Sequence, residues 1–204
     1  DYGMAVGVRK TYRKLYLRNL AKACEILCGF EQAEDTVKAY AAEIKEQYGI
    51  EPVLENRNDY QEREKPYLEK LIGAENVQKV QKFALEYAGK ETERATYQAM
   101  EALVHNLNTM HSRAGAQIPF SSINYGTDVS PEGRMVIRNV LLATDAGLGN
   151  GETPIFPIHI FKVKEGINYN PGDPNYDLFK LACRVSAKRL FPNFSFLDAP
   201  FNLQ

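Results

Sequence analysis

The stretch His105–Asp128, HNLNTMHSRAGAQIPFSSINYGTD, decides how this chain is expected to fold. It begins with helical spacing, turns near Gly115, and continues as a strand that ends in the polar cluster Asn124–Asp128. A helix start follows, with Ser130 as the N-cap and Pro131 as the first helical residue. A strand that delivers polar groups to the start of a helix is typical of ligand sites at the edge of a parallel sheet.

Strand and helix patterns alternate from this stretch to the end of the chain. Strands are expected at about 117–125, 154–163 and 193–197, with helices at 131–146 and from Pro174 onward, the latter capped by Asp173. This β-α-β-α-β order predicts parallel strands with right-handed crossovers. Three strands cannot close a barrel, so the pattern alone predicts a partial α/β sheet.

The first half of the chain has the apolar spacing of helices. We expect them at about 5–27, 32–48, 66–72, 75–88 and 91–111. The charged stretch from Glu51 to Lys65 is interpreted as a linker or insertion. The predicted organisation is therefore a helical region over 1–112, with a polar insertion at about 49–66, followed by a β-α-β-α-β region over 113–204.

Composition is that of an ordinary globular chain. Of 204 residues, 44% are hydrophobic and 25% charged, and the net charge of −1 provides no global field for nucleic acid or membrane. We find no signal peptide and no apolar run of membrane-spanning length. The three cysteines form no CxxC pair, which favours a reducing cytoplasm. A start at Asp1 and a stop after a strand are interpreted as the cut ends of a longer polypeptide.

Basic residues concentrate in the first helix, where no acidic side chain lies between Asp1 and Glu25. Residues four apart form one ridge, made of Lys10, Lys14, Arg18 and Lys22. Like charges at this spacing repel by about 0.2–0.5 kcal/mol per pair, so a bound anion would relieve the ridge. Two interpretations remain open: a face that meets solvent or an acidic partner, and a phosphate-binding face.

Polar residues also gather where the first and third strands end. Parallel strands place these ends on one edge of the sheet, and the group consists of Asn124, Thr127, Asp128, Asp198 and Asn202. Ser121 and Ser122 just upstream point to opposite faces, so one of them should point inward. Such groups suit sugar hydroxyls or phosphates, although capping and turn formation explain them more simply.

Other chemically interesting residues have plainer explanations. His105 and His111 are six apart and face different ways, so each is predicted to be structural rather than a metal ligand. Cys24 and Cys28 share a helix face but lack further ligands, which favours core thiols and no metal site.

Two further features bear on phosphate binding. The run Gly147–Gly151 follows a helix and lacks the GK[ST] ending of a phosphate loop, so a turn is predicted. Arg113, at a sharp helix-to-strand turn, suits a salt bridge across the sheet and phosphate binding equally well.

Four long motifs resemble the catalytic subunit of the anaerobic (class III) ribonucleoside-triphosphate reductases. They are HNLNTMHSRAGAQIPFSSINYGTD, SPEGRMVIRNVLLATDAGLGNGETPIFPI, NPGDPNYDLFKLACR and LFPNFSFLDAPFN. The likeness is strong from about Tyr97 to the end, weaker in Asp1–Ala5 and Val8–Lys10, and faint over 30–90. It implies that the sheet is part of the ten-stranded α/β barrel of ribonucleotide reductases and glycyl-radical enzymes.

The resemblance also implies a reaction, the reduction of ribonucleoside triphosphates to deoxyribonucleoside triphosphates. In this family a glycyl radical generates a thiyl radical that abstracts the ribose 3′ hydrogen, with formate or a thiol as reductant. The radical-bearing cysteine should lie beyond Gln204, and Cys183 does not match it. The glycyl radical and zinc sites also belong to other parts of the parent, so this fragment should contain no catalytic residue and be inactive alone.

Residue roles and partners follow from the same resemblance. Substrate binding is expected from Ser121 or Ser122, Asn124 and Asp198, and effector binding from Arg9, Lys10, Arg13 and Lys14. The implied partners are an ATP or deoxynucleotide effector, a second subunit in a homodimer, and a radical-SAM activating enzyme. Two alternatives are a non-catalytic nucleotide-binding or dimerisation module and part of another glycyl-radical enzyme, although SSINYGTD and FLDAPFN argue against the latter.

Overall fold

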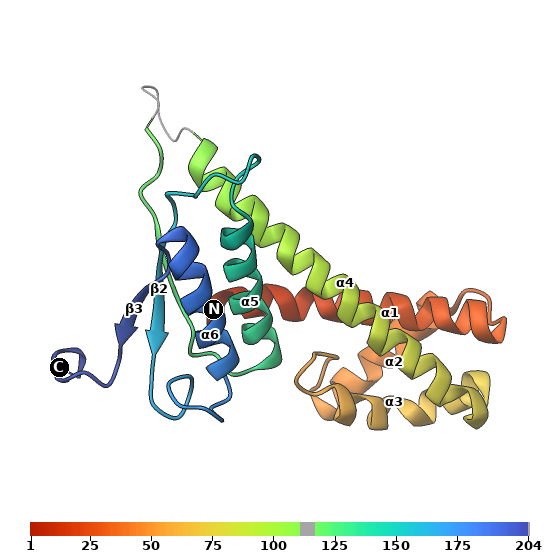
Figure 1. Ribbon diagram of the computed structural model, residues 1–204. Coiled ribbons are helices and arrows are strands. Elements are labelled where there is room, and N and C mark those ends of the chain that lie inside the picture. The colour runs from red at the N-terminus through yellow and green to blue at the C-terminus, as the bar shows by residue number, and fades with distance from the viewer. Residues whose placement is uncertain (111–116, 204) are drawn as a thin grey trace. The chain divides into compact units, whose positions relative to one another are not determined.

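The computed structural model describes residues 1–110 and 117–203, which form two compact units. One unit is Val6–Arg94; the other combines Asp1–Ala5 with Ala95–Gln204. Helices α1 (Tyr2–Cys28) and α4 (Ala74–Thr109) contribute residues to both units (Figure 1). The predicted helix end at His111 and the turn carrying Arg113 lie outside the described residues.

The unit Val6–Arg94 is built from helices around one apolar core. Besides parts of α1 and α4, it contains α2 (Ala33–Tyr48) and α3 (Arg57–Ile72). Helix α1 ends as its sequence predicts: Gly29 adopts φ 66°, and the next amide, Phe30 N, donates back to Cys24 O. The largest fully buried side chains of this core are Tyr12, Tyr16, Leu20, Ile44, Tyr60 and Leu68.

Helix α3 covers much of the charged stretch 51–65, which was interpreted as a linker or insertion, and it begins before the predicted helix start at residue 66. The helix starts at Arg57, and Pro66 lies inside it. Tyr60, Glu64 and Leu68 recur every four residues and are all buried, so the helix has a core-facing stripe after all. The sequence hides this stripe because one of its three members is a carboxylate and Pro66 suggests a break.

Helix α4 is also longer than expected. Two helices were predicted with a break near residue 90, but α4 continues without interruption through Gly89. A single helical glycine costs only about 1 kcal/mol relative to alanine. Buried residues on both sides of it, Ala88 and Thr92, supply packing that a lone glycine cannot undo.

A buried carboxylate connects the four helices of this unit. Glu64 of α3 accepts hydrogen bonds from Tyr16 of α1 at 2.6 Å, Tyr40 of α2 at 2.8 Å and Gln81 of α4 at 3.1 Å. Gln81 also exchanges side-chain to backbone hydrogen bonds with Gln61. Each helix thus supplies at least one side chain to a single network. Because an unpaired polar group inside a core is costly, the network fixes the register of the helices.

We predict that Glu64 makes this unit less stable as the pH rises. Desolvation raises the pKa of Glu64 to about 7, against an ordinary 4.5, although its hydrogen bonds oppose the shift. Its contribution is therefore fully present below pH 4.5 and is lost as the pH rises through 7, by about 3 kcal/mol in total. Urea unfolding at pH 5 and pH 8 should show this difference in the wild-type chain and a much smaller one in Glu64→Gln.

The exposed neighbour Glu62 on the same helix provides the control for that experiment. Glu62→Gln should keep the pH dependence of the wild-type chain. An unchanged pH dependence in Glu64→Gln would show that this carboxyl does not titrate as its burial requires.

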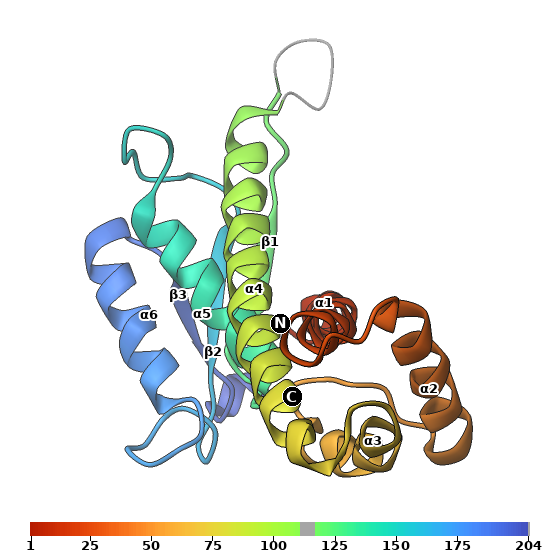
Figure 2. The same cartoon turned by 90° about the vertical axis from the view of Figure 1, so that its right-hand side faces the viewer.

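The second unit contains a parallel sheet of β1 (Ser122–Tyr125), β2 (Ile158–Val163) and β3 (Asn193–Phe196), in that order. Helices α5 (Pro131–Ala146) and α6 (Tyr176–Arg189) make the crossovers. Both helices, with the last part of α4, lie on one side of the strands (Figure 2). The predicted β-α-β-α-β order and parallel pairing are confirmed, and a short 3₁₀ helix, η1 (Pro200–Asn202), follows β3.

Local signals set the bounds of α5. Ser130 Oγ accepts the amide of Gly133 at 3.1 Å, as an N-cap should, and Gly147 ends the helix with φ 78°. The predicted span of 131–146 is confirmed. Within the described residues, no helix has the length and hydropathy needed to cross a membrane.

The other bounds differ from the predictions for identifiable reasons. Strand β2 begins at Ile158, because Pro157 has no amide to donate, and the ladder to β1 starts with Ile158 N donating to Ser121 O. Both strands are therefore shorter than predicted. The N-cap of α6 is Asn175 and not the predicted Asp173. The carboxylate of Asp173 instead accepts a hydrogen bond from the amide of Asn170 at 2.8 Å.

Candidate functional site

The two faces of the sheet differ sharply in burial. His159, Phe161 and Val163 of β2 are buried toward α5 and α6, whereas the alternate residues of β2 are only half-buried. Pairing register places the other strands' residues on the same two faces. The face turned away from the helices, here called the open face, carries Ser122, Asn124, Ile158, Ile160, Lys162, Asn193 and Ser195.

The open face therefore combines polar and apolar groups in adjacent positions. Asn124 pairs with Ile160 in the ladder, and Ile160 pairs with Asn193 on the other side. Both asparagines are exposed. Amide groups set beside branched apolar side chains are the mixture found in small-molecule sites, where apolar walls bind and a few polar groups orient the ligand.

The structure separates the two candidate serines. Ser122 is exposed and shares the open face with Asn124, while the hydroxyl of Ser121 is buried and has no hydrogen-bond partner among the described residues. The alternation predicted from sequence thus selects Ser122 as the serine on the open face.

Asp198 follows β3 and is exposed at the same edge of the sheet. Its carboxylate accepts the amide of Glu165 at 2.7 Å, so it caps the turn after β2. Asn202 likewise donates to Phe196 O at 2.6 Å. Both contacts belong to the capping and turn formation expected as the simpler explanation. Asp198 still lies at the strand ends, where ligand binding was also predicted.

The loop that follows β1, residues 126–128, is held from both sides. Asp1 Oδ2 accepts all three of its amides, those of Gly126, Thr127 and Asp128, at 3.0, 3.2 and 3.1 Å. Asn168 and Asn175 donate to its carbonyl oxygens. Both asparagines are fully buried.

Asp128 joins this loop to helix α5. Its Oδ1 accepts both the amide and the hydroxyl of Ser130, at 2.9 and 2.7 Å. A Cβ at Gly133 would lie 2.1 Å from Asp128 Cγ, so only glycine lets the carboxylate pack against the first turn of the helix. The negative charge lies at the positive end of the helix dipole, which favours it there.

Sequence reasoning missed Asn168 and Asn175 as structural residues. Both lie in or next to a segment rich in Asn, Pro and Gly, where asparagine ordinarily makes turns. Their partners are more than 40 positions away, at residues 126 and 128, and no local pattern encodes that contact.

His159 was also missed, and it lies on the helix-covered face. Its Nδ1 is 2.8 Å from the Tyr125 hydroxyl, and its Nε2 is 3.4 Å from Thr144 Oγ1. Burial lowers the pKa of His159 to about 4, so the ring is neutral at ordinary pH. It packs β2 against α5 and does not face the open side.

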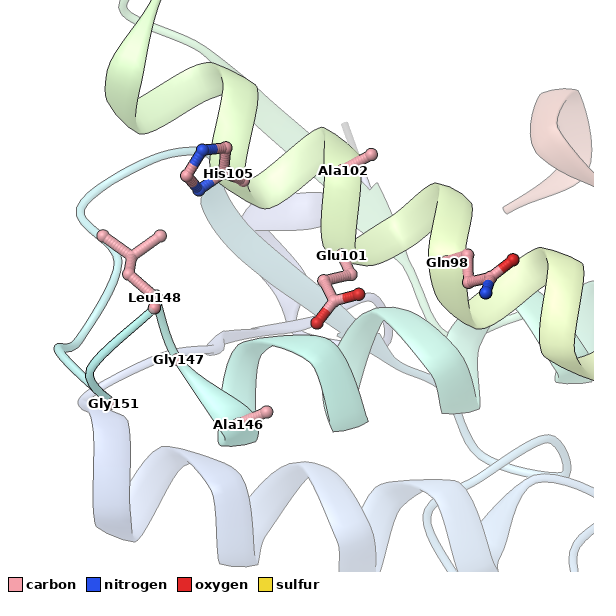
Figure 3. Close-up of a pocket in the computed structure, with 9 residues that line it drawn as sticks. Gln98, Glu101, Ala102, His105, Ala146, Gly147, Leu148 and Gly151 are labelled. Carbon is pink, nitrogen blue, oxygen red and sulfur yellow. The ribbon is translucent and has the colours of Figure 1, made fainter.

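A separate cavity of 530 Å³ lies beside the C-terminal end of α5, whereas the loop 126–128 lies by its N-terminal end. Figure 3 shows Gln98, Glu101 and His105 on one side of it, with the turn carrying Gly147, Leu148 and Gly151 opposite. His105 is exposed and lines this cavity. The turn predicted for 147–151 is present, with Leu148 N donating to Glu152 O at 2.9 Å.

The basic residues of α1 differ in their partners. Arg13 is paired with Glu51 at 2.6 Å, and Lys45 approaches the same oxygen at 3.1 Å. Desolvation raises the pKa of Glu51, but these two cations outweigh it and hold that pKa below its usual value. Lys10 and Lys14 are exposed, Arg9 is half-buried, and Lys14 lines a 160 Å³ cavity with Arg18 and Lys38.

The cysteines occupy different environments. Cys24 is buried, and desolvation raises the pKa of its thiol to about 12, which fits the predicted core thiol. Cys28 is half-buried and Cys183 is exposed. In the part of the chain that the structure describes, no three His, Cys, Asp or Glu side chains are grouped to hold a metal ion.

The parallel α/β unit with polar groups along one face and at its strand ends has the features of a ligand-binding sheet. Comparison with known proteins identifies its family: residues 65–204 match the family model of the anaerobic ribonucleoside-triphosphate reductases. The chain belongs to this family. The match starts well before Tyr97, so it includes part of the helical region where the motifs are faint.

Three enzymes named anaerobic ribonucleoside-triphosphate reductase illustrate the similarity. The Salmonella typhimurium protein is 38% identical over 108 residues, and the Escherichia coli protein 37% over 108, each alignment covering 52% of this chain and 15% of the relative. The protein of Enterobacteria phage T4 is 37% identical over 133 residues, or 63% of this chain and 22% of the relative. The chain thus matches less than a quarter of each relative.

We predict that Gly126→Ala destabilises the sheet unit by at least about 2 kcal/mol, because its backbone position is specific for glycine. Gly126 has φ 123°, and an added Cβ would lie 2.8 Å from Lys162 O. Gly149→Ala is the matched control, since nothing lies within 4 Å of its Cβ position. Urea unfolding should show a clear loss for Gly126→Ala only, and equal stability of the two variants would contradict the tight fit of the loop.

Proposed function

We propose that this chain forms part of the wall of a substrate pocket in an enzyme that reduces ribonucleoside triphosphates to deoxyribonucleoside triphosphates. The observation that supports this most is the open face, where Ser122 and Asn124 stand beside half-buried isoleucines in a chain of this reductase family. Ser122, Asn124 and Asp198 would contact the ribonucleotide. Ser121, whose hydroxyl is buried, would support this strand end rather than touch the substrate.

The sheet would be a section of the ten-stranded α/β barrel that the family resemblance implies. Within the described residues, β1 and β3 each pair with β2 alone, which leaves one edge of each available for a further strand. Continuing the sheet at both edges would turn the open face into the barrel interior. The division proposed from sequence then assigns residues 113–204 to the barrel and 1–112 to a region for effector binding and dimer formation.

The chemistry of the radical would come from other parts of the parent protein. A glycyl radical supplies the oxidising equivalent that begins reduction, and formate or a thiol supplies the electrons. The described residues do not fit a zinc site, because no three potential ligands are grouped, so no step is assigned to zinc. What this segment contributes is a polar face that orients the ribose and apolar neighbours that exclude water from it.

Partners of the parent follow from the same proposal. They are a ribonucleoside triphosphate, an ATP or deoxynucleotide effector, a second identical subunit, and a radical-SAM activating enzyme, all in the cytoplasm. The effector would bind α1 through Arg9, Lys10, Arg13 and Lys14. Exposure of Lys10 and Lys14 on successive turns supports this, and Glu51 would hold Arg13 in place beside them.

A second candidate function is a non-catalytic nucleotide-binding module. The cavity with Leu17 in its lining favours it, since it offers an apolar contact and three cations without using the sheet. The cations are Lys14, Arg18 and Lys38, the last of which is paired with Glu34. Only the first proposal also places a nucleotide against Asn124 on the open face, and a variant there can therefore separate the two.

For the barrel pocket, we predict that Asn124→Ala in the full-length parent protein lowers kcat/KM for a ribonucleoside triphosphate by about ten-fold or more. The amide would be lost from the face that orients the ribose. Asn150→Ala, in an exposed turn, is the control and should behave as the wild type. The isolated 204-residue chain should show no turnover, and either turnover by it or full activity of Asn124→Ala would count against the pocket.

For the effector site, the double variant Lys10→Glu/Lys14→Glu should abolish binding of deoxynucleoside triphosphates in a calorimetric titration, because phosphates would meet two carboxylates. Lys79→Glu/Lys82→Glu makes the same charge change at exposed positions of α4 and should bind normally. Equal loss in both double variants would assign the effect to net charge rather than to a site on α1.

A further inference from the structure

We propose that Asn175, together with Asn168 and Asp1, is a positioning residue for substrate, acting through the loop 126–128 on the neighbouring Asn124. This proposal rests on the proposed function of the open face. The three side chains, here called the loop clamp, come from segments far apart in the chain and meet at the end of β1. Their hydrogen bonds near the strand ends are made to backbone groups, so their effect on substrate would pass through the backbone of the loop.

The amide side of the loop is held by one oxygen. Three successive amides converge on Asp1 Oδ2 at 3.0–3.2 Å. Convergent backbone amides form a concave site for a negative charge, and here the chain fills that site with its own carboxylate. The orientation of each peptide plane from 126 to 128 is thereby fixed.

The carbonyl side is held by the two buried asparagines. Gly126 O accepts from Asn168 Nδ2 at 3.0 Å and from Asn175 Nδ2 at 3.1 Å, and Asp128 O accepts from Asn175 Nδ2 at 2.9 Å. Asn168 Nδ2 also donates to Lys162 O of β2 at 2.8 Å, which connects the loop to the next strand. Every proton of these two side-chain amides is thus engaged by the backbone near the strand ends.

The carbonyl oxygens of the same asparagines are anchored in turn. Asn175 Oδ1 accepts from Arg134 at 2.9 Å, and Arg134 forms a two-point contact with Asp177 at 3.0 and 2.7 Å. Asn168 Oδ1 accepts the amide of Lys164 at 2.9 Å. Side chains held at both ends locate the loop more firmly than turn residues facing solvent.

The loop transmits this constraint to Asn124 because the chain between them is short and tight. Gly126 lies only two residues after Asn124, and its backbone passes against Lys162 O with no room for a side chain. Asn124 is itself exposed. Its direction on the open face therefore depends on how the strand end is held.

Asn175→Asp is the variant that isolates the clamp. It keeps the shape of the side chain and its contact with Arg134, so the anchored side of the clamp is retained. It removes both donors to Gly126 O and Asp128 O and places an acceptor against them. Thr144→Val is the matched control: it removes a buried hydroxyl at the opposite end of α5.

The experiment measures equilibrium binding of a ribonucleoside triphosphate and of a deoxynucleoside triphosphate to the full-length parent protein. The variants compared are Asn124→Ala, Asn175→Asp, their double variant and Thr144→Val. We expect each of the first two to weaken ribonucleotide binding about ten-fold, and the double variant to lose no more than the larger single effect. Deoxynucleotide binding should be unchanged in all four, because the proposed effector site does not involve this loop.

Three results would overturn parts of this account in distinguishable ways. Wild-type ribonucleotide affinity in Asn175→Asp, or the same small loss as in Thr144→Val, would refute the positioning role alone. A double variant whose loss is the product of the two single losses would show that Asn175 does not act through Asn124. A wild-type full-length chain that binds no ribonucleotide would refute the proposed function, and with it the role of the clamp.

Discussion

Hydrogen bonding of the short loop after β1 is the constraint on which the sheet unit depends. A loop that leaves a strand and enters a buried helix cannot leave its amides and carbonyls unpaired, because each would cost about 1–3 kcal/mol. Asp1 takes the three amides, and Asn168 and Asn175 take carbonyls of the loop. The N-terminal residue, the loop after β2 and the start of α6 are thereby tied to one strand end, the one that carries Asn124.

The helical unit is organised by the same rule. Its four helices share an apolar core, but apolar packing alone specifies register weakly. Glu64 accepts from Tyr16, Tyr40 and Gln81, so any slip of one helix would leave a buried donor or the carboxylate unsatisfied. In both units, a few buried polar groups determine how elements made by ordinary hydrophobic patterns fit together.

This division explains what the sequence could and could not predict. The span of α5 was predictable because Ser130, Pro131 and Gly147 encode its ends locally, and the parallel order followed from the alternating pattern. Asn124 and Ser122 were predictable as site candidates from their strand position. The partners of Asn168 and Asn175 were not, since they are set by tertiary contacts. The first half of α3 was missed because its buried stripe includes Glu64 and because Pro66 suggests a break.

The central claim is that the open face of the sheet lines the ribonucleotide pocket. An experimental structure of the full-length chain with a bound ribonucleoside triphosphate tests it most directly. The ribose should lie on the open face, within hydrogen-bonding distance of the Asn124 amide. A nucleotide bound instead at the basic face of α1, or in the cavity beside Glu101 and His105, with no contact to β1, would contradict it.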